Sequence, residues 1–134
     1  MPKIILIVDD DPDVILYMST VLQDHGYHTI DAPNGQVGLE KVKSNHPDLI
    51  LLDLMMPQKS GISLLSDLKN DANTRNIPVI MVTGVSGETG IDLESFLNKR
   101  SNGDPDSETL KPQGYIRKPV DPEKLLRLVK KALE

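Results

Sequence analysis

The segment that most constrains the fold of this chain is a run of four aliphatic residues that ends in an aspartate, Leu49-Ile50-Leu51-Leu52-Asp53. An unbroken aliphatic run of this length is typical of a strand that is buried on both faces, as in parallel sheets. Asp53 follows at the carboxyl end of this predicted strand, which is the end where ligands bind in open α/β sheets. Asp53 is therefore the candidate functional centre of the chain.

Composition excludes several classes of protein. The 134 residues suffice for one domain with its own core. A formal net charge of -5 at pH 7 disfavours a nucleic-acid partner, because phosphate recognition needs clustered Lys and Arg. The absence of cysteine excludes disulfides, thiolate metal sites and a Cys nucleophile. No apolar run approaches the roughly 20 residues that cross a bilayer, and the N-terminal segment is too short for a signal peptide, so we expect a cytoplasmic protein without a membrane partner.

Strand-like and helix-like segments alternate along the chain. The predicted strands are 3–8, 27–31, 49–53, 78–82 and 115–117. The predicted helices begin near Asp11-Pro12, Asn34-Gly35, Ser60-Gly61, Ile91 and Asp121-Pro122, where a capping residue or a helix-starting proline precedes an apolar 3.6-residue pattern in most cases. Such alternation predicts a parallel sheet with helices on both faces and right-handed crossovers.

Polar residues follow four of the five predicted strands. Asp9 and Asp10 follow the first strand, Asp53 ends the third, Thr83 follows the fourth and Lys118 follows the fifth. The carboxyl ends of parallel strands lie along one edge of the sheet, so these residues are expected to converge. The sequence thus predicts a site with three carboxylates, one hydroxyl and one ammonium group.

This set of groups suits phosphoryl transfer to a carboxylate. Three clustered carboxylates repel one another, and a hard divalent cation such as Mg²⁺ relieves the repulsion while keeping several waters. A carboxylate beside such a metal can attack phosphorus and form an aspartyl phosphate. The phosphoryl oxygens then need a metal, a cation and a hydroxyl donor around them, and Asp10, Lys118 and Thr83 would provide these.

Four motifs carry a resemblance to a known family. In chain order they are Ile7-Val8-Asp9-Asp10-Asp11-Pro12, Leu51-Leu52-Asp53-Leu54-Met55-Met56-Pro57, Val82-Thr83-Gly84 and Tyr115-Ile116-Arg117-Lys118-Pro119. With these motifs the chain resembles the receiver domain of two-component response regulators. The resemblance implies a single domain over residues 1–134 with an α/β, flavodoxin-like three-layer fold: a doubly wound five-stranded parallel sheet in the order 2-1-3-4-5 and five helices.

The resemblance also implies roles for matching residues. Asp53 would accept the phosphoryl group, with Lys118 and Thr83 as its catalytic neighbours. Mg²⁺ or Mn²⁺ would be bound by Asp10, by Asp9 largely through water, by Asp53 and by the backbone carbonyl of Met55. Thr83 and Tyr115 would form a switch pair, and a cis Lys118-Pro119 bond would help to aim Lys118 at the site.

The implied function is a phosphorylation-activated signalling module without turnover of a separate substrate. Its phosphodonor would be a sensor histidine kinase or a phosphotransfer protein, and it would then bind a downstream protein or pass the phosphoryl group on, as a monomer or weak homodimer. Alternatives are a receiver excised from a larger transcriptional regulator or hybrid kinase, and a non-phosphorylatable pseudo-receiver. A rival class, the haloacid-dehalogenase type of phosphatase, needs a second Asp where this chain has Met55.

Two features depart from the family pattern. A polar stretch at about 101–113, between the fourth helix and the fifth strand, makes this connection longer than usual, and we hypothesise that it is a docking surface. Met55 and Val85, each two residues after a site residue, are apolar and cannot orient an attacking water. We therefore expect slow self-dephosphorylation, which Met55→Asn and Val85→Glu would accelerate.

Overall fold

A parallel sheet forms the centre of the molecule. The computed structural model describes residues 2–54, 61–83 and 113–134. The sheet has five parallel strands in the order β2-β1-β3-β4-β5, which confirms the predicted topology. The strands are β1 (Ile4–Val8), β2 (His28–Ala32), β3 (Leu49–Asp53), β4 (Val79–Thr83) and β5 (Gly114–Arg117).

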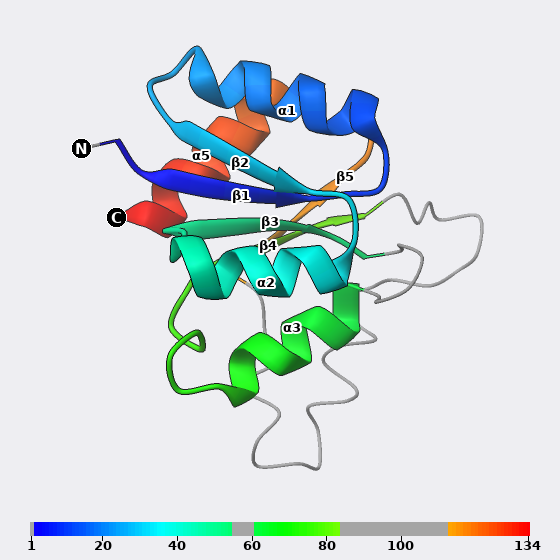
Figure 1. The fold of residues 1–134 in the computed structure, drawn as a ribbon. Helices are drawn as coiled ribbons and strands as arrows, with labels where there is room; N and C mark the ends of the chain where they lie inside the picture. Colours follow the sequence, from blue (N-terminus) through cyan, green and yellow to red (C-terminus); the bar gives the residue numbers. More distant parts are fainter. Residues whose placement is uncertain (1, 55–60, 84–112) are drawn as a thin grey trace.

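Helices cover both faces of the sheet and complete a three-layer α/β fold (Figure 1). The described residues contain α1 (Pro12–Gln23), α2 (Gly35–Asn45), α3 (Gly61–Asn70) and α5 (Pro122–Leu133). In Figure 1, α1 and α5 lie on one face, and α2 and α3 lie on the other. The predicted helix near 91–97 and nearly all of the 101–113 stretch fall outside the described residues and remain predictions. No helix among the described ranges is long and apolar enough to span a membrane.

Alternation along the strands assigns each site residue to a face of the sheet. Ile5, Ile7, Leu49 and Leu51 pack with α1 and α5 in one buried cluster, and Val79 and Met81 pack with α2 and α3 in the other. Successive residues of a strand point to opposite faces, so the next positions of these rows continue the same sides. Asp9 and Asp53 therefore extend the α1/α5 face, and Thr83 extends the α2/α3 face.

The helix starts follow the predicted capping residues. The Asp11 carboxylate accepts a hydrogen bond from the Asp13 N–H and caps α1, and the Asn34 side chain does the same for α2 with the Val37 N–H. Asp121 occupies the cap position of α5, but its side chain accepts no capping hydrogen bond. The helix therefore begins at the predicted position, with Pro122 as its first residue and without a capping bond from the Asp121 side chain.

Candidate functional site

Three carboxylates meet at the carboxyl edge of the sheet. One carboxylate oxygen from each of Asp9, Asp10 and Asp53 lies within 4.8 Å of the other two. β1 and β3 are adjacent parallel strands, so residues that leave their ends are neighbours although they are 44 positions apart in the chain. Asp9 is fully buried and Asp53 is 4% exposed, whereas Asp10 is exposed to solvent. The cluster is therefore buried at Asp9 and Asp53 and open to solvent at Asp10, where a ligand could enter.

Lys118 reaches this cluster from the segment after β5. Its Nζ lies 3.0 Å from Asp9 Oδ2 and 3.6 Å from Asp53 Oδ2. On the other side, its backbone N–H donates to the carbonyl of Thr83 at 2.8 Å, which ties the segment to β4. The Lys118-Pro119 peptide bond is cis, as expected. The sequence predicted Lys118 as the charge partner of Asp53, whereas in the structure its nearer carboxylate is that of Asp9.

The charges around Lys118 keep it protonated. Burial lowers the pKa of Lys118, but the adjacent carboxylates of Asp9 and Asp53 raise it by more, so that the pKa lies above its usual value of 10.5. The ammonium group is thus charged at neutral pH and offsets part of the negative charge of the cluster. When all three carboxylates are ionised, two negative charges remain uncompensated within this group of four side chains.

The donor set fits a hard divalent cation. Asp9 Oδ1 accepts the Asp11 N–H at 2.9 Å, which fixes the orientation of the carboxylate. Its buried Oδ2 faces Lys118 as an ion pair and accepts no hydrogen bond from the other residues that the structure describes. Carboxylate oxygens with residual negative charge and an open solvent side are the ligands that Mg²⁺ takes while it keeps several waters. Met55, the expected carbonyl ligand, lies outside the described residues.

Thr83 and Tyr115 lie on neighbouring strands and on the same face of the sheet. Thr83 ends β4 and is 6% exposed. Tyr115, on β5, is partly buried, pairs in register with Met81 and packs against the cluster of buried residues under α2 and α3. Because Met81 is two residues before Thr83, the tyrosine lies one step along the face from the threonine. This placement is compatible with the predicted pairing of the two side chains.

Gly61 is part of the site in a way that the sequence analysis missed. As the first residue of α3 it donates its N–H to the Leu54 carbonyl at 2.9 Å. A Cβ at this position would lie 2.1 Å from the carbonyl oxygen of Asp53, closer than any real contact. The start of α3 is thus packed directly against the backbone that carries Asp53. A glycine at the first position of a helix, where it is a poor helix former, was the available signal for such an approach.

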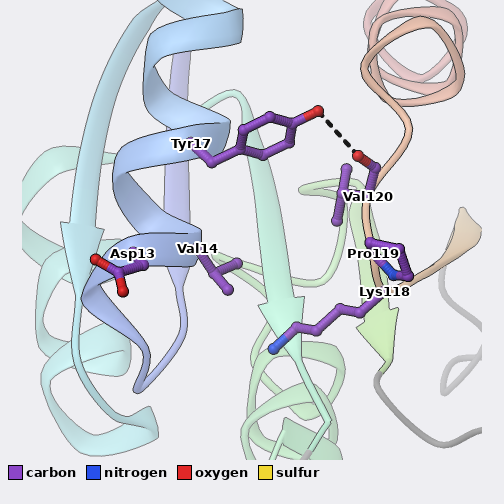
Figure 2. Close-up of a pocket in the computed structure, with 6 residues that line it drawn as sticks. All are labelled: Asp13, Val14, Tyr17, Lys118, Pro119 and Val120. Atoms are coloured by element: carbon purple, nitrogen blue, oxygen red, sulfur yellow. Dashed lines mark hydrogen bonds between the residues drawn. The ribbon is translucent and has the colours of Figure 1, made fainter.

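A cavity of about 380 Å³ adjoins the site on the α1 side. Val14 and Tyr17 of α1 line it from one side, and Lys118, Pro119 and Val120 line it from the other, with Asp13 also in its lining. Figure 2 shows the Lys118 side chain extending from the Pro119 segment toward α1, and the Tyr17 ring reaching back to Val120. The alkyl stem of Lys118 is therefore bordered by open space on this side.

The chain is similar to known proteins in sequence and in fold. Residues 5–102 match the family model described as the response regulator receiver domain. The chain is 34% identical over 129 residues to Protein PilH of Pseudomonas aeruginosa, with 96% of each covered. It is 32% identical over 136 residues to the polar-differentiation response regulator DivK of Brucella anthropi, covering 99% of this chain and 98% of DivK. A CheY-like receiver domain protein from Methanospirillum hungatei superimposes with a TM-score of 0.81 at 30% identity, covering 99% and 94% of the two chains.

Proposed function

Because this chain belongs to the response regulator receiver domain family of two-component signalling, we propose that Asp53 is the residue that accepts the phosphoryl group. The observation that supports this assignment most directly is the position of Asp53. Asp53 ends a strand that is buried on both faces, and it is itself buried. The Lys118 ammonium lies 3.6 Å from one of its carboxylate oxygens. Asp9 and Asp10 lie beside Asp53, and we assign to them the binding of a cation.

The proposed reaction is a nucleophilic displacement at phosphorus. A carboxylate oxygen of Asp53 attacks the phosphorus of a phosphohistidine, a P–O bond forms while the P–N bond breaks, and the bonding pair leaves with the imidazole, which binds a proton. Lys118 pairs with the phosphoryl oxygens. Asp9 and Asp10, with the Met55 carbonyl, would hold Mg²⁺ or Mn²⁺, which when bound supplies positive charge to the transferring group.

We assign the response to phosphorylation to Thr83 and Tyr115. The threonine hydroxyl would turn toward the new phosphoryl oxygens, and the tyrosine ring on the same face would then pack into the space that it leaves. The charge added by phosphorylation would in this way shift the equilibrium between two arrangements of the Thr83 and Tyr115 side chains.

The partners follow from the same chemistry. The phosphodonor would be a sensor histidine kinase or a phosphotransfer protein, and the phosphorylated chain would bind a downstream protein or pass the phosphoryl group on. We propose the cytoplasm as the location of this reaction. We propose one domain over residues 1–134, acting as a monomer or weak homodimer without turnover of a separate substrate, in which the 101–113 stretch contributes a docking surface.

Incubation with phosphoramidate and MgCl₂ tests the assignment of Asp53. Intact mass should rise by one phosphoryl group in the wild type, and Asp53→Asn should abolish the gain. Asp24→Asn, at an exposed aspartate that follows α1, is the matched control and should be labelled as the wild type is. A wild-type chain that gains no phosphoryl group, or an Asp53→Asn variant that gains one, would contradict the proposal.

A further inference from the structure

A hydrogen bond joins α1 to the segment between β5 and α5. The Tyr17 hydroxyl donates to the carbonyl oxygen of Val120 at 3.0 Å, across 103 positions of the chain (Figure 2). Val120 lies two residues after Lys118, and its side chain is 8% exposed within the buried cluster under α1 and α5. Tyr17 itself is 42% exposed, so its ring is only partly used for packing while its hydroxyl holds this bond.

The bond lies at a cavity that borders the segment carrying Lys118. On the β4 side, the segment is held by the Lys118 N–H and the Thr83 carbonyl, 2.8 Å apart. On the α1 side lies the 380 Å³ cavity, which the stem of Lys118 lines. Open space cannot hold a flexible four-carbon side chain in one position, whereas packed side chains would. The Tyr17–Val120 bond therefore ties the backbone that carries Lys118 to α1, in addition to the packing of the Val120 side chain.

We propose that Tyr17 is a positioning residue for Lys118 in phosphoryl transfer to Asp53. This inference rests on the proposed function. The Tyr17–Val120 bond fixes the 118–120 backbone against α1, and this in turn fixes how the Lys118 ammonium is shared between Asp9 Oδ2 at 3.0 Å and Asp53 Oδ2 at 3.6 Å.

The physical reason is that the ammonium group lies closer to Asp9 than to Asp53, the proposed phosphoryl acceptor. Lys118 has to pair with oxygens of the group that arrives at Asp53, and a displacement of about 1 Å is enough to cost a large part of such a contact. Without the tie, the segment gains freedom on the cavity side, and the population in which Lys118 reaches Asp53 falls. Tyr17 touches none of the reacting atoms and acts only through this segment.

Tyr17→Phe tests the inference, because it removes the hydroxyl and keeps the ring that lines the cavity. We expect the rate constant for phosphorylation by phosphoramidate, at saturating MgCl₂ and phosphodonor, to fall roughly three- to tenfold, the range set by one hydrogen bond. The Kd for Mg²⁺, measured by calorimetry, should stay within about twofold of the wild-type value, since the carboxylates are untouched. A reduced rate constant with an unchanged Kd is the signature of a group that positions Lys118.

Two controls separate this role from general destabilisation. Tyr27→Phe changes a partly buried tyrosine next to the same core, and Val21→Ala loosens the packing of α1 without touching the tie. Both should keep the wild-type rate constant. A wild-type rate constant in Tyr17→Phe, or an equal loss in Val21→Ala, would overturn the inference while the labelling of Asp53 stands. If the wild type gains no phosphoryl group at all, it is the proposed function that fails.

Discussion

At the scale of single residues, the position of Lys118 between two aspartates decides what the site can do. Its ammonium is held by Asp9 and is within reach of Asp53, so that this one side chain can neutralise the carboxylates and, under the proposed function, pair with an arriving phosphoryl group. The pKa of Lys118 is raised above 10.5 by these carboxylates against the effect of burial. The stabilising contribution of the pair is therefore complete below pH 10.5 and is lost as the pH rises through the raised pKa.

Gly61→Ala should damage both the fold and the site. The added Cβ would lie 2.1 Å from the Asp53 carbonyl oxygen, so either the start of α3 or the end of β3 has to move. We expect the free energy of unfolding in urea to fall by about 1–3 kcal/mol, as in other overpacked sites, and the phosphorylation of Asp53 to slow in parallel. Gly114→Ala is the control, because the nearest atom to its Cβ would be 3.5 Å away. Wild-type stability of Gly61→Ala would show that the contact relaxes without cost.

At the scale of helices and strands, the sequence predicted best what depends on local pattern. β1, β3 and β4 are nearly completely buried, so their aliphatic runs carried a strong signal. β2 and β5 are edge strands with exposed positions, so their signal was weaker. The predicted bounds match for β3 and differ by one residue at one or both ends of the other four strands. The convergence of Asp9, Asp10, Asp53 and Lys118 was also predictable, because parallel topology brings the ends of these strands together.

Contacts between elements were not predictable from the same patterns. The Tyr17–Val120 hydrogen bond depends on how α1 is placed against a loop 103 positions away, and no local periodicity contains that information. The same holds for the approach of Gly61 to the Asp53 carbonyl and for the preference of Lys118 for Asp9. For the Tyr17–Val120 bond and for the choice of Lys118 between two aspartates, the alternatives differ by about one hydrogen bond, which is smaller than the packing energies that set the fold.

The connection between α3 and β4 depends on a buried lysine. Lys69, in the last turn of α3, is 7% exposed and donates from Nζ to the carbonyls of Arg75 at 3.0 Å and Ile77 at 3.4 Å. Burial lowers the pKa of Lys69 below its usual value of 10.5. Between the lowered pKa and 10.5 the unfolded chain binds more protons at this residue than the native chain does, so the stability from Lys69 rises with pH in this window.

Lys69→Met should remove this pH dependence. We expect the difference in free energy of unfolding between wild type and Lys69→Met to grow in favour of the wild type as the pH is raised from 7 toward 10.5. Urea titrations at a series of pH values measure it, and Lys43→Met, at an exposed lysine in the last turn of α2, is the comparison. A difference that stays constant or shrinks with rising pH would mean that the ammonium group of Lys69 is not penalised by burial.

At the scale of the whole molecule, we expect the acidic cluster to make stability depend on divalent cations. The chain carries a net charge of -5, and three of its carboxylates are gathered at one edge of the sheet, where only Lys118 offsets them among the described residues. A cation that binds this edge binds only the native state, because the three aspartates come together only when the strands pair. Under the proposed function, cation binding, folding and phosphoryl transfer would therefore be coupled through the same four side chains.

Unfolding in the presence of MgCl₂ tests this coupling. At a free concentration ten times the Kd, Mg²⁺ should raise the free energy of unfolding by about 1.4 kcal/mol. Asp10→Asn should lower this increment strongly and should slightly stabilise the metal-free protein, because it removes a repulsive charge from an exposed side chain without breaking a buried bond. NaCl at matched ionic strength separates specific binding from screening, which acts on all surface charges. If MgCl₂ stabilises Asp10→Asn as much as it stabilises the wild type, the three carboxylates do not form one cation site, and the repulsion between them is relieved by Lys118 and solvent alone.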